Sequence, residues 1–364
     1  MKQRKKRSPL SRILRFLGAL IGCLVLLAAA GILVLTVLEW RPADLEEAPL
    51  RGGASRNAAA GEELTLMTWN IGYGALGDNA DFFMDGGTIV ETADEARVRE
   101  NLDGMVKTIL AQSPDILFFQ EVDRDSARSH HIDEAAVLTE QLPGYVSSFA
   151  NNFKAAFVPY PIPPIGKVDS GLLTFSALNA SQSQRIQLPI PFKWPIRMAN
   201  LKRCVLLTRI PVESASKELV LINLHLEAYD DGTGKAQQTA MLREILQRET
   251  DKGNYVIAGG DFNQIFSNVD ASLYPVKEGL WAPGAISVED FGASFSCLMD
   301  AGVPTCRSLD RPYAGADPDT FQFYAIDGFI VSNNVQVLSL QTLNEQFVCT
   351  DHNPVLLRVK LSDE

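Results

Sequence analysis

A run of 23 residues without charge or proline, from Phe16 to Leu38, places the strongest constraint on this chain of 364 residues. At about 1.5 Å per residue, a helix of this length crosses a hydrocarbon core of about 30 Å. Seven Lys and Arg residues precede the run, whereas Glu39 and Arg41 follow it. Under the positive-inside rule, this asymmetry predicts a basic cytoplasmic tail over residues 1–15, a transmembrane helix over residues 16–38, and the remainder outside the cell membrane.

A cleaved signal peptide is the alternative, because the small residues Ala28, Ala29 and Ala30 are of the kind that a signal peptidase accepts. However, residues 32–38 continue the apolar run beyond that point, and the whole run exceeds the usual apolar core of about 7 to 15 residues. An uncleaved anchor is therefore favoured. Residues 39–63 mix Pro, Gly, Ala and charge without periodicity, which predicts a linker.

The net charge of -11 is distributed unevenly along the chain. The first 41 residues hold eight Lys or Arg and a single acid, so residues 42–364 carry a formal charge of -18. A surface of that sign repels long polyanions, so no stable complex with DNA or RNA is expected. The content of 46% hydrophobic and 21% charged residues also excludes a disordered chain.

Beyond the linker, short β-prone runs are interleaved unevenly with two helical patterns. From Glu95 to Ser113, apolar residues recur at spacings of three and four and predict an amphipathic helix. A second helix is predicted from about Lys235 to Asp251. Buried strands are predicted at residues 64–69, 116–120, 172–175, 205–208, 219–224, 255–258, 329–331 and 355–359. We therefore expect one large α/β or α+β sandwich over residues 64–364.

Five cysteines are present, and Cys23 lies within the apolar run. The short separation of Cys297 and Cys306 makes them the favoured pair if a disulfide forms outside the membrane. Free buried thiols are an equally good interpretation of the sequence.

Polar residues of a few chemical types recur at the ends of the predicted strands. Each has an ordinary structural explanation when taken alone, such as a turn for Asn70 or a hydrogen-bonded core histidine for His225. Strand ends, however, are where such folds gather their functional sites, and two of only four histidines lie at these positions. The residues are Asn70, Glu121, His225, Asp261, Asn263, Asp327, Asp351 and His352.

Oxygen ligands from Asn, Glu and Asp suit Mg²⁺ or Mn²⁺, whereas the absence of a Cys cluster or an HExxH pattern makes a zinc site less favourable. A hard cation beside two imidazoles is suited to phosphate-ester hydrolysis, in which one histidine aids the attacking water and another protonates the leaving oxygen. No GxSxG elbow, P-loop or GxGxxG fingerprint follows a predicted strand.

The segments TWNIG, FFQEVD, NLHL, GGDFN, IDGFIV and TDHNPV, in this order, resemble the motifs of the endonuclease/exonuclease/phosphatase superfamily. That superfamily includes deoxyribonucleases, abasic-site endonucleases, sphingomyelinases and inositol-polyphosphate 5-phosphatases. The resemblance covers nearly all of residues 64–361. It implies an α+β fold, the DNase I-like four-layered α/β/β/α sandwich, preceded here by one transmembrane helix.

The resemblance also implies roles for the strand-end residues. Asn70 and Glu121 match the metal-site pair, with Glu121 as the direct Mg²⁺ ligand, and Asp351 would assist the metal. In the catalytic set, His225 would contact the phosphate and act as general acid, Asp261 and Asn263 would position or activate the attacking water, and Asp327 would pair with His352. The family leaves open whether Asp261 or His352 is the base.

Three functions compete on the sequence. An anchored, outward-facing phosphodiesterase with a lipid or small phosphodiester substrate fits the acidic domain and the segments FVPYPIPPIGK and LPIPFKWPI, which could dip into a membrane surface. A surface endonuclease would need a local basic patch, for which the candidates are Lys193, Arg197, Lys202 and Arg203. An inactive binding module of the same fold predicts the loss of at least one key residue, and all of them are present.

Overall fold

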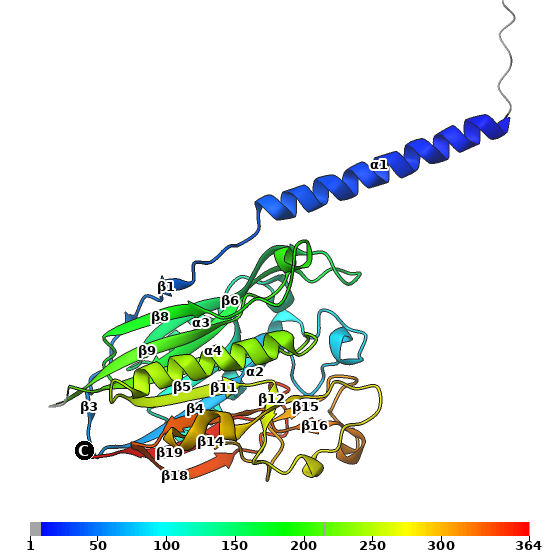
Figure 1. Cartoon of the computed structure of the whole chain (residues 1–364). Coiled ribbons are helices and arrows are strands. Elements are labelled where there is room, and N and C mark those ends of the chain that lie inside the picture. The colour runs from blue at the N-terminus through cyan, green and yellow to red at the C-terminus, as the bar shows by residue number, and fades with distance from the viewer. Residues whose placement is uncertain (1–8, 214–215, 364) are drawn as a thin grey trace, which may run out of the picture.

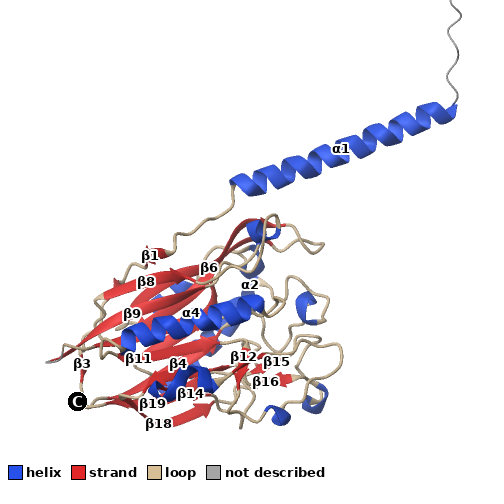
Figure 2. Cartoon of the chain, in the orientation of Figure 1, coloured by secondary structure: helices blue, strands red, loops and turns tan. Residues whose placement is uncertain are grey.

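Two β-sheets pack face to face, and helices cover the outer face of each sheet (Figures 1 and 2). This computed structural model describes residues 9–213 and 216–363. Within them, α2 (Glu95–Gln112) and α3 (Glu134–Gln141) cover one sheet, and α4 (Thr233–Thr250) covers the other. This order of layers confirms the predicted α+β class and the α/β/β/α sandwich.

The described residues form one sheet of seven strands and one of eight. The seven-stranded sheet has the order β18 (Val335–Thr342), β19 (Val355–Leu361), β4 (Glu63–Asn70), β5 (Ile116–Asp123), β7 (Gly166–Ser176), β6 (Val146–Val158) and β2 (Arg51–Gly52). The eight-stranded sheet has the order β1 (Leu45–Glu47), β8 (Gln182–Gln187), β9 (Cys204–Glu213), β10 (Glu218–His225), β11 (Tyr255–Asp261), β17 (Asp327–Ser332) and β14 (Phe295–Leu298), while β3 (Ala58–Ala59) pairs with β9. Two small sheets pair β12 (Gln264–Phe266) with β13 (Gly284–Ile286), and β15 (Cys306–Arg307) with β16 (Phe323–Tyr324).

Side chains alternate in direction along the central strands, so the apolar residues of one strand pack in two different parts of the core. In β10, Leu219 and Leu221 lie in the core between the sheets, whereas Val220 and Ile222 pack in the core beneath α4. Successive side chains of a strand point to opposite faces, so a strand covered on both sides is apolar at every position. This explains why the predicted strands appear as continuous apolar runs.

The inter-sheet face of β10 becomes polar toward one end. The same face that carries Leu219 and Leu221 continues with Asn223 and His225, all of them buried. Asn223 Oδ1 accepts a hydrogen bond of 2.8 Å from Gln120 Nε2 of β5, and Asn223 Nδ2 donates to the carbonyl of Phe119 at 3.1 Å. The two sheets are thus joined by apolar packing at one end and by hydrogen bonds at the other.

The two predicted helices begin and end close to the expected residues. Asp94 caps α2 by accepting a hydrogen bond of 2.8 Å from the Arg97 amide, and Ser113 ends the helix in the left-handed conformation, directly before Pro114. The strands β6 and β18 were not predicted, because polar residues interrupt their apolar pattern. β6 is held in place by its long antiparallel pairing with β7, and β18 is an edge strand with an exposed face.

The segment 39–63 differs from the predicted linker, because it packs on the folded domain. It supplies β1, β2 and β3, which pair with β8, β6 and β9. Glu39 is buried, and its Oε1 accepts hydrogen bonds of 3.0 Å from both Arg197 Nε and Lys202 Nζ. The domain therefore begins within two residues of the end of helix α1 (Pro9–Val37).

Helix α1 projects from the domain (Figure 1). The most apolar stretch within its segment Arg12–Val37 has a mean hydropathy of 2.8, and none of this stretch is buried. The helix is long and apolar enough to cross a membrane, as the sequence predicted.

The suggested disulfide between Cys297 and Cys306 is wrong, because all five thiols are free. Cys297 lies in β14 and packs in the core beneath α4, whereas Cys306 lies in β15 near His352. Burial raises the pKa of each of these two thiols to about 12. Both are therefore protonated packing groups.

Candidate active site

The predicted polar residues converge at the end of the sandwich where the inter-sheet faces become polar. β10 and β11 are parallel and place His225 beside Asp261, and the antiparallel pairing of β11 with β17 places Asp261 beside Asp327. β4 and β5 are parallel as well. β4 ends at Asn70, and Glu121 lies near the end of β5. Because parallel strands share a carboxyl-terminal edge, residues far apart in the sequence meet there.

Asp327 and His352 form the most clearly defined pair in the site. Asp327 Oδ2 lies 2.8 Å from His352 Nδ1, and both side chains are buried. The main chain of His352 is fixed as well, because its carbonyl accepts a hydrogen bond of 2.9 Å from Trp69 Nε1. A carboxylate at Nδ1 holds the imidazole in one orientation and leaves Nε2 facing the other acidic groups.

Asn70 connects the two sheets at the site. Its Nδ2 donates hydrogen bonds of 3.1 Å to Glu121 Oε1 and to Asp261 Oδ2, and its Oδ1 accepts from the Gly72 amide at 3.1 Å. The predicted turn role of Asn70 is visible in the contact with Gly72, and the same side chain contacts two carboxylates of the predicted site. Its amide holds two carboxylates of different strands close together.

Glu121 points into the site because β5 is irregular there. The register between β5 and β7 shifts between Phe119 and Val122, and Glu121 has a φ of 57°. A bulge of this kind re-aims one side chain, and left-handed backbone at a non-glycine residue is a strain that clusters at functional sites. The side chain of Glu121 is therefore only partly buried, between two fully buried neighbours.

The turn formed by the GDFN segment, residues 260–263, fixes the positions of Asp261 and Asn263. Asp261 Oδ1 accepts a hydrogen bond of 2.8 Å from the Asn263 amide, and Asn263 Nδ2 donates to the Leu226 carbonyl at 2.9 Å. Gly260, with a φ of 149°, allows this turn, because a Cβ there would lie 1.9 Å from the Leu224 carbonyl oxygen. Asp261 Oδ2 then lies 3.4 Å from His225 Nε2 and 3.8 Å from His352 Nε2.

The two imidazoles have opposite electrostatic environments. Burial, together with the positive charges of Arg203 and His352, holds the pKa of His225 well below its usual value, and its Nδ1 has no partner among the described residues. Burial also opposes the charged form of His352, but the negative charges of Asp327 and Asp351, together with the hydrogen bond to Asp327, raise the pKa of His352 well above the usual value. His225 is thus neutral and His352 is cationic at neutral pH.

The carboxyl groups of the site are held close together in a buried environment. Burial and the charge of Asp327 raise the pKa of Asp261 to about 7. Burial, with a contribution from the charge of Glu121, also raises the pKa of Asp351. One oxygen of Asp327, Oδ1, is buried without a hydrogen-bond partner among the described residues. A cation would relieve this crowding of negative charge.

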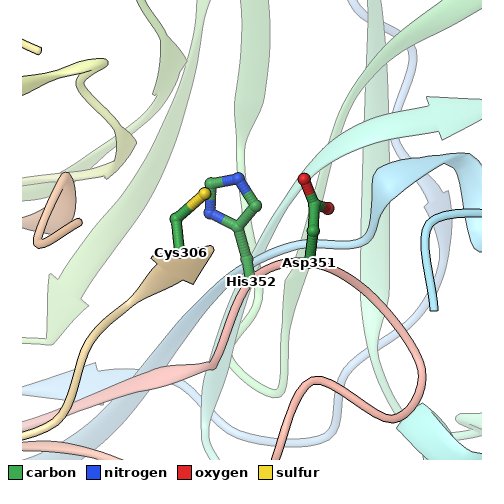
Figure 3. A group of neighbouring side chains, drawn as sticks. All are labelled: Cys306, Asp351 and His352. Carbon is green, nitrogen blue, oxygen red and sulfur yellow. The ribbon is translucent and has the colours of Figure 1, made fainter. Parts of the chain in front are cut away.

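These donors fit a hard divalent cation on the side of Glu121 and Asp351. Asp351 also belongs to a group with Cys306 and His352, whose ligand atoms lie within 4.8 Å of one another (Figure 3). Cys306 is an unsuitable ligand for a hard ion, because its sulfur is a soft donor. Asp261, Asp327 and His352 form a second group whose ligand atoms lie within the same distance of one another. The site thus holds acidic groups that could bind a divalent cation, and Asn70, Glu121 and Asp351 stay its predicted ligands.

A cavity of about 670 Å³ opens over these residues. It is lined by His225, Asp261 and His352, and also by three arginines that the sequence did not single out as site residues, namely Arg128, Arg203 and Arg307. Arg128 makes two hydrogen bonds of 3.0 Å to Asp123 and stacks at 3.7 Å over the Tyr73 ring. No motif marks Arg128, which lies in the short 3₁₀ helix η3 (Ala127–Ser129) after β5, so only the fold reveals it.

The second cavity arginine, Arg203, belongs to the candidate basic patch, most of which is neutralised. Arg203 Nε pairs with Glu227 at 3.3 Å, and both side chains are buried. Arg197 and Lys202 both pair with Glu39 at 3.0 Å. Lys193 is the one exposed member without an ion pair among the described residues. The structure therefore does not present these four residues as a free basic groove.

The fold, with a carboxylate cluster beside an Asp–His pair, defines a metal-dependent phosphoric ester hydrolase. Residues 67–352 match the Endonuclease/Exonuclease/phosphatase family. Because this match spans more than half of the chain, the chain belongs to that family, as its motifs predicted. A search of curated protein sequences finds no match.

Solved structures of this family share the fold. An endonuclease/exonuclease/phosphatase from Beutenbergia cavernae is 18% identical with a TM-score of 0.56, covering 82% of this chain and 72% of that chain. The catalytic domain of human Nocturnin, solved with a bound sulfate anion, is 16% identical with a TM-score of 0.50, covering 86% of this chain and 97% of that chain. At these identities the likeness concerns the fold alone.

Proposed function

We propose that this protein is a membrane-anchored, outward-facing Mg²⁺-dependent phosphodiesterase whose substrate is a membrane lipid or a small phosphodiester. The observation that carries the proposal is the composition of the cavity wall. Ile32 and Leu35 of α1 line the same cavity as His225, Asp261 and His352. The helix that is able to cross the membrane thus forms part of the wall of the cavity that holds the catalytic residues.

The orientation rests on charge. Seven Lys and Arg residues precede the apolar run, and the domain that follows it is strongly acidic. This arrangement favours a cytoplasmic amino terminus and an extracytoplasmic catalytic domain.

Asn70, Glu121 and Asp351 would hold the metal ion. Once bound, a divalent ion supplies positive charge to the phosphoryl oxygens of the substrate. Arg128 and Arg203 line the same cavity, but each is paired with a carboxylate, Asp123 and Glu227 respectively. The cavity therefore offers little free positive charge besides the metal ion, which suits a single phosphate group rather than an extended polyanion.

The protonation states favour Asp261 as the group that takes a proton from the attacking water. Its pKa of about 7 lies near the pH at which a general base is most effective. His352, cationic and oriented by Asp327, is placed to donate a hydrogen bond to a phosphoryl oxygen. His225 is neutral, which favours hydrogen bonding to the phosphate over the general-acid role that the family resemblance implied.

A nucleic-acid substrate is disfavoured on two grounds. The domain carries a formal charge of -18 outside the first 41 residues. In addition, Arg197, Lys202 and Arg203 are each paired with a carboxylate. Binding of a polyanion would require these pairs to open.

A parallel substrate panel tests the proposal. The detergent-solubilised chain is incubated with sphingomyelin, glycerophospholipids, inositol phosphates, plasmid DNA and RNA, with Mg²⁺ or with a chelator, and His352→Ala serves as the inactive control. We expect Mg²⁺-dependent hydrolysis of a lipid or small phosphodiester that is lost in the chelator and in the variant. Preference for DNA, with binding that weakens steeply in salt, would overturn the lipid assignment.

A further inference from the structure

Large apolar side chains are exposed in two loops at one edge of the domain. Tyr160 and Ile162, in the loop between β6 and β7, are 70% and 94% exposed, and Trp194 and Ile196, between β8 and β9, are 54% and 63% exposed. We call these four residues the apolar rim. Exposed apolar side chains that gather in this way mark an interaction surface.

The apolar rim lies beside the end of helix α1. Trp194 Nε1 donates a hydrogen bond of 3.2 Å to Thr36 Oγ1, and Thr36 Oγ1 lies 3.0 Å from the sulfur of Met198. Thr36 belongs to the last turn of α1, which ends at Val37. In Figure 1, the loops that follow β6 and β8 lie on the same side of the domain as α1.

The junction between helix and domain is held by ion pairs around the buried carboxylate of Glu39. Glu39 pairs with Arg197 and Lys202 at 3.0 Å and with Arg41 at 3.1 Å. Arg185 lies 5.0 Å over the ring of Trp40. Because these contacts begin two residues after the helix ends, they restrict rotation of the domain about the helix axis. The apolar rim is therefore kept at the level where α1 leaves the membrane.

We propose that the apolar rim inserts into the headgroup region of the leaflet from which α1 emerges, and that the cavity opens toward this leaflet. Trp and Tyr prefer this interface, and Ile162 adds an apolar side chain that gains from deeper burial. Tyr160 and Ile196 belong to the rim and also line the cavity. A lipid could then move from the bilayer to the catalytic residues along an apolar wall. This inference rests on the proposed anchoring and specifies how the site meets its substrate.

Depth-dependent fluorescence quenching tests the insertion. The full chain, with Cys23→Ala, carries an NBD probe at Ile162→Cys and is reconstituted into phosphatidylcholine vesicles. Leu338→Cys, on edge strand β18 at the far side of the domain, is the matched control, because Leu338 is a 39% exposed apolar residue. We expect nitroxide-labelled lipid to quench the probe at position 162 several-fold more than at 338, and aqueous iodide to show the reverse order.

Two outcomes would overturn the insertion. Equal quenching by nitroxide lipid at both positions places the rim in water, and protection of position 162 from both quenchers indicates that a protein covers it. In a separate sample that keeps Cys23, a probe on this residue reports whether helix α1 lies in the bilayer. If Cys23 is quenched by lipid and position 162 is not, the rim inference fails while the anchoring stands; if neither is quenched, the anchoring fails as well.

A kinetic variant supplies a second test. Ile162 does not line the cavity among the described residues, so Ile162→Asp leaves the catalytic groups unchanged. We expect this variant to lose about tenfold in kcat/KM on lipid in vesicles and to keep its rate on a soluble phosphodiester. Equal effects on the two substrates, or none on either, would contradict the inference.

Discussion

His352 Nδ1 lies 2.8 Å from Asp327 Oδ2, although the two residues come from opposite sides of the sandwich. Asp327 opens β17 of the eight-stranded sheet, and His352 lies three residues before the start of β19 of the seven-stranded sheet. The pair therefore forms only when the sheets pack, and its carboxylate determines the charge of the imidazole.

Replacing Asp327 by Asn keeps the shape of this side chain and removes its charge. The pKa of His352 should then fall toward its usual value, because the largest contribution that offsets burial would be lost. Activity at neutral pH should fall by about 10²-fold or more. Imidazole NMR of the metal-free chain, which has four histidines, measures the titration directly. An unchanged His352 titration in the variant would contradict the assigned coupling.

Asp261 should make the metal-free protein less stable at high pH. Its folded pKa of about 7 lies above the usual value of 3.8, so the folded state binds the proton more tightly, and stability is lost as the pH rises through this range. Asp261→Asn should therefore be more stable than wild type at pH 8, by an amount on the order of a few kcal/mol, and similar near pH 4. Urea unfolding in chelator at both pH values measures this difference. A variant that is no more stable than wild type at pH 8 would refute the raised pKa.

Glu121 should control metal affinity. Glu121→Gln keeps the hydrogen bond from Asn70 but removes the charge, so the Mg²⁺ concentration for half-maximal activity should rise by about tenfold or more. Thermal unfolding gives a readout that does not depend on turnover. Added Mg²⁺ should raise the Tm of wild type and leave the Tm of the variant nearly unchanged; equal shifts in both proteins would place the metal elsewhere.

Asn223 should be required for stability because it joins the sheets. Asn223→Ala leaves the Gln120 amide and the Phe119 carbonyl without this partner and should cost about 2 kcal/mol of unfolding free energy. Asn179→Ala is the matched control, because Asn179 donates a comparable hydrogen bond of 2.8 Å to Asn57 on the exposed surface. The control should change stability by less than about 0.5 kcal/mol. Similar losses for both variants would show that the inter-sheet position has no special role.

Much of the fold and of the candidate site can be predicted from the sequence, because the apolar runs and the polar residues that end them indicate the same strands and the same sheet edge. Strands covered on both faces produce continuous apolar runs, and the polar residue that ends each run marks the shared edge of the sheet. For that reason, residues as distant as Asn70 and His352 could be assigned to one site before the fold was known.

Other features depend on tertiary contacts that have no local pattern. Arg128 is held in the cavity by Asp123 and by the Tyr73 ring, and neither contact follows from sequence spacing. The segment 39–63 shows no periodicity because its strands β1, β2 and β3 are only two or three residues long. Cys297 and Cys306 are close in sequence, but the fold directs one into the core and the other toward His352.

The most direct test of the proposed function is ³¹P NMR of vesicles that contain the full chain. We predict that wild type with Mg²⁺ converts a phospholipid phosphodiester signal into a phosphomonoester signal, and that chelator or His352→Ala abolishes the change. An unchanged lipid spectrum, in a sample where wild type cleaves added DNA, would contradict the account.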